Sequence, residues 1–195
     1  TSTLWKETGR WNKFGGKEFF SFKNRDGKDF TVAATHEEAA TALAQDVIQS
    51  YRDLDTAIYQ IGRKFRDDHA RKGLLRAKEF IMKDAYSFHK DQESMQDMYN
   101  EFIQAYRNIF DRLGLEYSEV AAYNGDMGGS SSHEFIAESG VGSDTYKKCH
   151  DCSYGTKNLD KNRCADCGSE LEEVNGIEIG HCFQLDDRYT KETSL

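Results

Sequence analysis

Proline is absent from this chain of 195 residues. Average usage of about 5% would place roughly ten prolines in a chain of this length, so the composition is strongly biased. The chain also lacks an apolar run of about 18 residues, the length that a membrane-spanning helix requires. Its first segment, TSTLWKETGRWNKFGG, is polar and lacks the apolar stretch of a signal peptide. We therefore expect a soluble, cytoplasmic chain that is not exported and has no membrane partner.

Positive charge is also scarce, because 26 Lys and Arg face 34 Asp and Glu and the formal net charge is −8. This balance argues against a chain that binds DNA or RNA over its whole surface, but it leaves room for one local basic site. Leu, Ile, Val and Phe make up only about 19% of the residues, whereas 12% are aromatic. The length and composition predict one folded domain with a thin core and a small appendage.

Two hairpins are predicted from aromatic-rich runs on either side of turns. Residues 18–33 place Asp26-Gly27, a dipeptide suited to positive φ, between two short strands. Residues 57–68 and 74–89 are rich in aromatic residues and Ile and are joined by a charged stretch, DDHARKG. We expect these two segments to form antiparallel strands connected by a mobile loop.

Two helices are predicted from apolar residues at helical spacing. Thr35 and Glu38 form the S/T-x-x-E pattern of a capping box at the start of the first helix. The apolar stripe that follows consists of Ala40, Leu43, Ala44, Val47, Ile48 and Tyr51. The second helix begins near Asp91 and ends at Gly114. Its stripe, which we interpret as core, consists of Met95, Met98, Tyr99, Phe102, Ile103, Tyr106, Ile109, Phe110 and Leu113.

The last third of the chain combines loop and strand. Residues 124–132 are rich in Gly and Ser and predict a loop, whereas residues 173–187 return to strand character. Strands and helices are therefore interleaved without a regular βαβ rhythm. This pattern predicts an α+β fold, in which an antiparallel sheet is flanked by helices.

Positive charge is concentrated in residues 63–83, where eight Lys or Arg side chains face three carboxylates. Side chains two apart share one face of a strand. One such face would carry Arg76, Lys78, Phe80, Met82, Asp84 and Tyr86, and Arg66 and Asp68 share parity on the neighbouring strand. An Arg for phosphate, a ring for a base and an acid for an amine suit a site for a nucleotide and an amine. The alternative is a solvated basic loop.

Four of the five cysteines lie in residues 146–170, in two C-x-x-C pairs separated by eleven residues: Cys149, Cys152, Cys164 and Cys167. Each pair can chelate a metal from a tight turn, so four thiolates would complete the tetrahedral Zn²⁺ site of a zinc ribbon. Disulfides are the alternative and are disfavoured in a chain without an export signal. Cys182 falls in a predicted strand and is expected to be buried. No role is assigned to His133 or His150.

Residues 65–68, Phe-Arg-Asp-Asp, followed by a charged loop and Arg76-x-x-x-Phe80, resemble motif 2 of class II aminoacyl-tRNA synthetases. The surrounding segments resemble prolyl-tRNA synthetases of the bacterial type: LWKETGRW, ATHEE, SYRDL, YQI, KFRDDHARKGLLRAKEFIMKDAYSFH, MGGSSSHEF and GIEIGHCFQL. Together they cover nearly the whole chain and are far more specific than a lone short motif. The resemblance implies a class II catalytic fold that joins proline to ATP as prolyl-adenylate, releases pyrophosphate and passes the prolyl group to tRNA(Pro).

The resemblance also implies roles for individual residues. Arg66 would hold the α-phosphate and approach the proline carboxylate, Arg76 would reach the terminal phosphates, and Phe80 would stack on adenine. Asp68, which stands where the family usually has Glu, and Glu178 complete the ATP-site candidates. The proline-binding candidates are Thr35, Glu37, Arg66, Met82, Asp84, Tyr86 and His181. Arg66 and Arg76 are the catalytic candidates, and Mg²⁺ would bridge the phosphates.

The chain departs from the family's pattern in several places. Motif 1 with its dimer interface, motif 3 with its ATP-site arginine, the editing insertion and the anticodon-binding domain are missing, so we expect reduced activity and weak tRNA binding, and the sequence leaves the oligomeric state open. Ala34 stands where the family commonly has Pro, and Asp186 where it commonly has Gly. We divide the chain into a catalytic core at 1–145, a four-cysteine zinc-ribbon-like segment at 146–170 and a returning strand of the core at 171–195.

Two other interpretations compete with that of a catalytic fragment. One is a catalytically inactive binding or regulatory module that is derived from a synthetase and carries a zinc ribbon. The other is an engineered scaffold. The missing motifs favour a module, whereas the intact Arg66, Arg76, Phe80 and Asp84 favour the enzyme. Proline-dependent exchange of pyrophosphate into ATP would separate them.

Overall fold

The computed structural model describes residues 2–14, 19–70, 72–122, 127 and 129–191. Residues 124–126 and 128 of the predicted loop at 124–132 lie outside these ranges, and its last two residues belong to a strand. The chain divides into two compact units. Unit 1 comprises Thr1–Met95 and Asp187–Leu195, and unit 2 comprises Gln96–Asp186.

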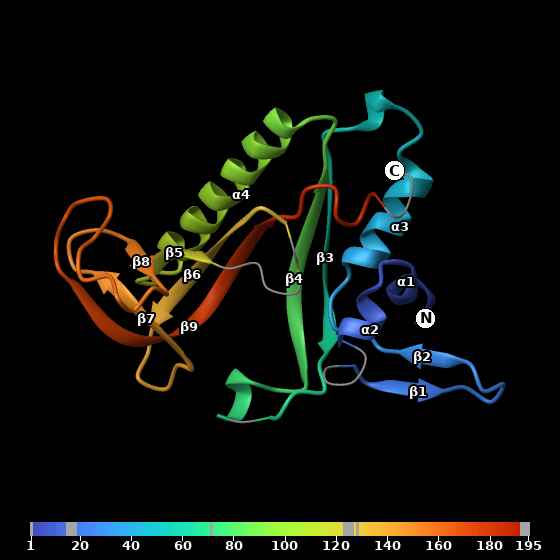
Figure 1. Cartoon of the computed structure of the whole chain (residues 1–195), viewed down its shortest axis with the longest axis horizontal. Coiled ribbons are helices and arrows are strands. Elements are labelled where there is room, and N and C mark those ends of the chain that lie inside the picture. The colour runs from blue at the N-terminus through green and yellow to red at the C-terminus, as the bar shows by residue number, and fades with distance from the viewer. Residues whose placement is uncertain (1, 15–18, 71, 123–126, 128, 192–195) are drawn as a thin grey trace. The chain divides into compact units, whose positions relative to one another are not determined.

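Unit 1 contains short helices and two hairpins (Figure 1). The helices are α1 (Ser2–Glu7), α2 (Arg10–Phe14) and α3 (Glu37–Val47), with 3₁₀ turns at Tyr51–Asp53 and Gly73–Leu75. The strands are β1 (Ser21–Lys23), β2 (Asp29–Thr31), β3 (Thr56–Phe65) and β4 (Glu79–Phe88). A small apolar cluster of Trp5, Trp11, Phe19 and Ala34 packs the beginning of the chain against the segment that leads into α3.

The β1–β2 hairpin confirms the prediction for residues 18–33. Its strands are antiparallel, and Gly27 has the positive φ of 76° that its turn position requires. The Asn24 side-chain oxygen accepts hydrogen bonds from the backbone N–H groups of Asp26 and Lys28. Local turn chemistry is therefore sufficient to set this hairpin.

The β3–β4 hairpin is a ten-residue antiparallel ladder in which Lys64 pairs with Phe80 and Gln60 with Asp84. Strand parity correctly predicts that Phe80, Met82, Asp84 and Tyr86 share a face, which is the more buried one. Arg76 and Lys78 precede β4, and Arg66 and Asp68 follow β3, so parity does not place these four side chains. The outer face exposes 75% of Tyr59, 70% of Ile61 and 73% of Ile81.

Helix α3 forms where the sequence predicts it, but the predicted capping box is wrong. The N-cap residue is His36, and its side chain makes no capping hydrogen bond. The Thr35 hydroxyl instead donates to Oε1 of Glu37 at 2.7 Å, and the Glu38 carboxylate accepts from Arg10. Both side chains are thus drawn away from the backbone by charged partners nearby, which are stronger hydrogen-bond partners than a neutral amide.

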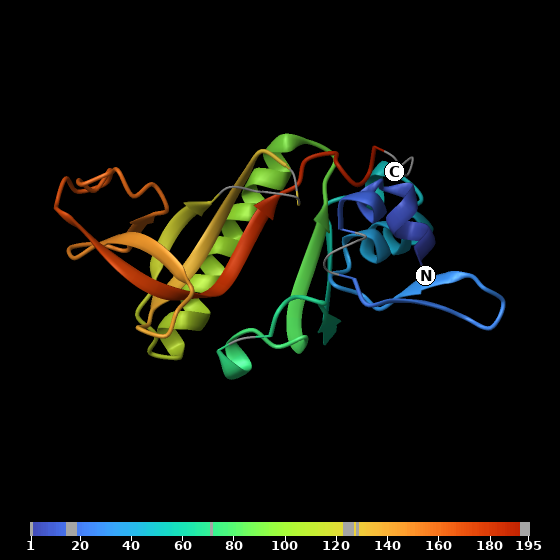
Figure 2. The same cartoon turned by 60° about the horizontal axis from the view of Figure 1, so that its bottom comes forward.

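Unit 2 is a five-stranded closed barrel accompanied by a long helix (Figure 2). The helix is α4 (Gln92–Arg112), whose first turn belongs to unit 1. The strands are β5 (Ser118–Ala122), β6 (Ser131–Glu138), β7 (Asp144–Cys149), β8 (Tyr154–Thr156) and β9 (Leu171–Gln184), in the order β5-β6-β9-β7-β8. The α+β class is confirmed. The expected purely antiparallel sheet is wrong, because the barrel closes through a parallel β5–β8 pair.

Helix α4 packs on the barrel through the stripe that the sequence predicts. Tyr99, Ile103 and Phe110 form one buried cluster with Phe135 of β6 and Cys182 of β9, which confirms the burial of Cys182. The helix follows Asp91, whose carboxylate accepts from the Ser94 backbone N–H at 2.8 Å, and it is followed by Gly114 at a φ of 67°. None of the described helices is long and apolar enough to cross a membrane.

Candidate functional site

The first group of predicted site residues lies where α3 begins. Thr35 and Glu37 are both buried, and Oε1 of Glu37 accepts the Thr35 hydroxyl. Oε2 of Glu37 accepts Nη1 of Arg10 at 3.2 Å, and the same nitrogen donates to Oε1 of Glu38 at 2.8 Å. One guanidinium therefore serves two adjacent carboxylates in an environment with little water.

The second group is centred on Asp84 in β4. Its Oδ1 accepts the Lys64 ammonium at 2.7 Å, and its Oδ2 accepts Nε2 of Gln60 at 3.0 Å and the Tyr86 hydroxyl at 2.5 Å. The Tyr86 oxygen in turn accepts the backbone N–H of His36 at 3.2 Å. The network links β3, β4 and the start of α3, so the two groups belong to one site in unit 1.

Electrostatic effects act on this site in opposing directions. Burial alone would raise the pKa of Asp84, but hydrogen bonds from Lys64, Tyr86 and Gln60 outweigh it and hold the pKa below its ordinary value. Burial, together with the charge of Glu37, raises the pKa of Tyr86, so this phenol stays neutral. Burial and the Lys64 charge lower the pKa of His36. Asp84 is thus favoured as a carboxylate, whereas its partner Tyr86 stays a neutral phenol.

Arg66 and Phe80 lie at the end of the hairpin next to this site. Nε of Arg66 donates to the Ala34 carbonyl at 3.2 Å, and the guanidinium carbon lies 5.4 Å from the centre of the Phe80 ring. Within the described part of the chain, the two terminal nitrogens of Arg66 have no hydrogen-bond partner. They remain available to an anionic group, and the ring beside them offers a flat apolar surface.

The remaining predicted site residues of unit 1 are Asp68, Arg76 and Met82. Arg76 is exposed and forms a 3.1 Å ion pair with Asp68, so the two ATP-site candidates neutralise each other in this structure. Met82 lies on the inner face of β4, opposite Gly62. The structure links six of the predicted residues directly to this site: Thr35, Glu37, Arg66, Phe80, Asp84 and Tyr86.

Glu178 and His181 lie in unit 2, on β9, where they meet Glu134 of β6. Nδ1 of His181 is 3.5 Å from Glu178 and 3.9 Å from Glu134. Residues three apart in a regular strand point to opposite faces. Here the pairing with β6 shifts between Phe135 and Ile136, which leaves Ile179 as an extra residue, a β-bulge. The bulge turns Glu178 and His181 toward each other.

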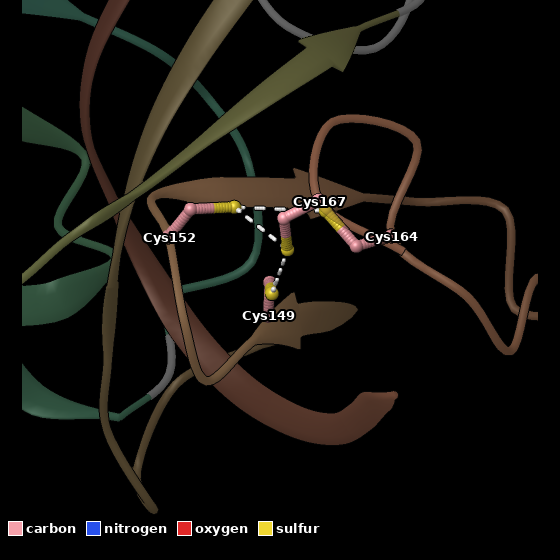
Figure 3. Close-up of side chains that lie close together, drawn as sticks. All are labelled: Cys149, Cys152, Cys164 and Cys167. Atoms are coloured by element: carbon pink, nitrogen blue, oxygen red, sulfur yellow. Dashed lines mark hydrogen bonds between the residues drawn. The ribbon is translucent and has the colours of Figure 1, made fainter. Parts of the chain in front are cut away.

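The four paired cysteines converge in unit 2 on two turns, one after β7 and one before β9 (Figure 3). Their sulfurs lie 3.4 Å (Cys149 to Cys167), 3.6 Å (Cys152 to Cys164) and 3.7 Å (Cys152 to Cys167) apart. All four lie within 4.8 Å of one another and none is in a disulfide. Tetrahedral thiolates about 2.3 Å from Zn²⁺ would be about 3.8 Å apart.

The backbone of both cysteine turns supports thiolate ligands. The N–H groups of Asp151 and Asp166 each point at the sulfur two residues earlier, Cys149 and Cys164, at 3.4 Å. The carbonyl of Cys164 accepts from Gly168, whose φ of 80° suits glycine. The two turns thus present their sulfurs in the same way, as metal-binding C-x-x-C turns require.

Several residues of these sites were not identified from the sequence. Arg10 and Lys64 supply the buried cations, and Glu134 and Lys157 complete the cluster around His181, with Lys157 2.5 Å from Glu134. Lys64 carries a detectable signal, because it shares parity with Gln60 on a strand opposite Asp84. The other three contact partners far away in the sequence, and local pattern gives no indication of them.

Comparisons with known proteins agree with this geometry. A family model described as the tRNA synthetase class II core domain (G, H, P, S and T) matches residues 20–194. The rat probable mitochondrial proline–tRNA ligase is 42% identical over 193 residues, which cover 96% of this chain and 40% of that protein. The proline–tRNA ligase of Bacillus licheniformis is 45% identical over 187 residues, 95% of this chain and 31% of that protein.

Solved structures share the fold. Prolyl-tRNA synthetase of Giardia lamblia in complex with prolyl-adenylate matches with a TM-score of 0.73 at 15% identity, over 98% of this chain and 34% of that one. The Cryptosporidium parvum enzyme complexed with halofuginone and AMPPNP matches with a TM-score of 0.69 at 13% identity, over 100% and 34%. The chain thus spans two fifths or less of these relatives. It belongs to the family of class II tRNA synthetase core domains, in which its curated relatives are proline–tRNA ligases.

Proposed function

We propose that this chain carries part of the amino-acid activation site of a proline–tRNA ligase. One observation carries the proposal: the terminal nitrogens of Arg66, without a partner among the described residues, lie beside the Phe80 ring, at a site whose other end holds the Glu37 and Asp84 carboxylates. A cation, an aromatic surface and acids are the groups that a phosphate, a base and an amine require. Proline and ATP together supply those three groups.

The amine end is specified by the acceptors left on Glu37. An ionised carboxylate has about four acceptor positions, of which Thr35 and Arg10 fill two. About two remain, which matches the two N–H donors of a secondary ammonium group such as that of proline. Asp84, held ionised by Lys64, adds negative charge behind Tyr86. Met82 contributes apolar surface on the same strand face.

At the nucleotide end, Arg66 would hold the α-phosphate between the proline carboxylate and the Phe80 ring. Arg76 would reach the terminal phosphates once these replace Asp68 as its partner. A proline carboxylate oxygen attacks the α-phosphorus, the bond to the bridging oxygen breaks, and pyrophosphate leaves with that electron pair. The reaction brings anions together and needs no protein nucleophile, so alignment and positive charge provide the catalysis.

Mg²⁺ is expected for the family, but the described residues do not offer it a site of their own. The only oxygen-bearing cluster found among them contains a His, and its Glu134 is already paired with Lys157. Mg²⁺ prefers octahedral oxygen ligands and is often held mainly by substrate phosphates. No step is therefore assigned to it here.

We further propose that Cys149, Cys152, Cys164 and Cys167 bind one Zn²⁺. The sulfur separations and the N–H groups aimed at Cys149 and Cys164 support this assignment. Zinc with four thiolates has no open position, so it would crosslink the two turns and take no part in the reaction. In this view, residues 146–170 form a structural appendage of the catalytic core at 1–145 and 171–195.

Glu178 and His181 remain candidates for ATP and proline binding because the sequence resembles the family there. Transfer of the prolyl group to tRNA(Pro) is likewise proposed from the relatives, and we expect this acidic chain to hold tRNA weakly. Both proposals concern the complete enzyme, of which the chain covers only part.

The decisive experiment is proline-dependent exchange of labelled pyrophosphate into ATP, with single-turnover formation of adenylate as a second assay. We expect weak activity in the parent and none in the double variant Arg66→Ala, Arg76→Ala. Arg63→Ala is the matched control, because Arg63 lies on the outer side of the same hairpin in an exposed pair with Glu79. Equal activity of parent and double variant would mean that the chain is a binding module or an inert scaffold.

A further inference from the structure

Arg10 is a deeply buried cation of unit 1 to which neither the resemblance nor the proposed reaction gives a role. Its side chain is 1% exposed, and its guanidinium lies 4.8 Å from the Trp5 ring and 5.3 Å from the Tyr189 ring. An aromatic ring attracts a cation that lies over its face within about 6 Å of its centre. Residues from both ends of the chain, Trp5 and Tyr189, therefore hold the Arg10 side chain in addition to its carboxylate partners.

The guanidinium reaches Glu37 from the side opposite Thr35. Nη1 of Arg10 donates to one Glu37 oxygen and the Thr35 hydroxyl donates to the other, so both oxygens are fixed in direction. Burying a carboxylate without a partner is costly, and a single hydroxyl would not offset that cost. Arg10 thus helps to fix the orientation of Glu37 and supplies a cation beside it in a dry environment.

We propose that Arg10 is a positioning residue that holds Glu37 ready to receive the amine of the substrate. The inference rests on the proposed function, because it assigns the amine to Glu37. It adds a residue outside motif 2 that acts on amine binding without touching the substrate. Nucleotide binding, which involves Arg66 and Phe80, should be independent of Arg10.

The test compares Arg10→Met and Arg10→Lys with the parent by calorimetric titration of L-proline and, separately, of ATP. We expect Arg10→Met to weaken proline binding roughly tenfold or more, as loss of one charge-assisted hydrogen bond would. ATP affinity should stay within about twofold, and Arg10→Lys should recover part of the proline affinity. Arg107→Met, which breaks the paired contact of Arg107 with Glu119 in unit 2, is the control for general destabilisation.

A second measurement needs no substrate. With ¹³C-labelled glutamate, the Glu37 carboxyl resonance, assigned through Glu37→Gln, should move in Arg10→Met and stay in place in Arg107→Met. An unmoved resonance, or an unchanged proline affinity in a folded Arg10→Met, overturns the inference. A moved resonance in a chain whose parent binds no proline would confirm the positioning and reject proline as the ligand. Arg10→Lys provides the comparison if Arg10→Met does not fold.

Discussion

The ammonium of Lys64, a side chain with no exposed surface, donates to Asp84 at 2.7 Å across the β3–β4 ladder. Lys64 and Asp84 are not direct cross-strand partners, because Lys64 lies opposite Phe80 whereas Asp84 lies opposite Gln60, four residues earlier in β3. The long Lys side chain spans this offset to reach the carboxylate. A buried cation thus supports Asp84, a proline-binding candidate from the sequence that the structure shows at the centre of a hydrogen-bond network.

Removing this cation should destabilise the fold strongly. Lys64→Met leaves the Asp84 charge with only neutral donors, and we expect a loss of about 3–5 kcal/mol in the free energy of unfolding. Urea denaturation measures it. Lys78→Met is the control, because Lys78 forms an exposed pair with Asp67 and should cost less than about 1 kcal/mol. Similar losses in the two variants would contradict the importance of burial.

The stability difference between the parent and Asp84→Asn should depend on pH. The pKa of Asp84 is lowered in the folded state, so its contribution is present above the unfolded-state value of 3.8 and is lost as pH falls through the lower folded-state value. At sufficiently low pH the protonated parent resembles the variant, and the two unfolding free energies should converge. Denaturation curves from pH 7 downward provide the check; a difference that widens in acid would reverse the sign of the argument.

Arg66→Ala should weaken ATP binding with little loss of stability. The side chain makes one hydrogen bond to Ala34 and leaves its terminal nitrogens unused among the residues that the structure describes. Each charge-assisted contact to phosphate is worth about 1.5–3 kcal/mol, or roughly 10- to 150-fold in affinity. Calorimetric titration with ATP measures the change, with Arg63→Ala as the control. Unchanged affinity would remove Arg66 from the nucleotide site.

Glu37→Gln and Glu38→Gln form a matched pair, because each replaces one of the two carboxylates that pair with the buried Arg10 guanidinium by a neutral amide. Only Glu37 also accepts the Thr35 hydroxyl and is assigned to the amine. Proline affinity should therefore fall roughly tenfold or more in Glu37→Gln and change much less in Glu38→Gln. Equal effects would indicate that the net charge of the cluster matters and that Glu37 has no specific role.

Metal analysis of protein purified without added zinc should find one Zn²⁺ per chain. Chelation should increase hydrogen exchange within residues 146–170, because both turns depend on the crosslink, while β3 and β4 keep their protection. Cys164→Ser should lose the metal, whereas Cys182→Ala, which alters a buried apolar thiol elsewhere in the barrel, should retain it. A metal-free parent with all thiols reduced would exclude the zinc assignment.

Local patterns predict the elements better than their connections. The Asp26-Gly27 turn, the α4 stripe and the inner face of β4 all depend on residues a few positions apart, and the structure confirms them. Helix α3 also forms, but of its predicted stripe only Ala40 and Ala44 are buried, whereas Leu43 and Val47 are exposed. The capping box fails because Arg10, far away in the sequence, competes for Glu38. The bulge at Ile179 and the parallel β5–β8 pair depend on how distant strands meet.

The candidate site shows the same contrast between local patterns, which the sequence predicts, and contacts between distant segments, which it does not. Strand parity brings Phe80, Asp84 and Tyr86 to one face, but it gives no sign of the buried cation Arg10. The departure at Asp186 acquires a physical meaning from the structure, because this residue has a φ of 51° in the region that favours glycine. The glycine that the family commonly has there would adopt this conformation without strain.

The outer face of the β3–β4 hairpin has a consequence for handling the protein. An exposed apolar strip on this two-stranded ribbon consists of Tyr59, Ile61 and Ile81. Such ribbons can associate with one another through their apolar faces and unpaired edges. The net charge of −8 opposes this by mutual repulsion between molecules. Salt near 1 M shortens the screening length to about 3 Å. Colloidal stability should therefore be highest at low ionic strength, and adding salt should cause aggregation most readily at high protein concentration.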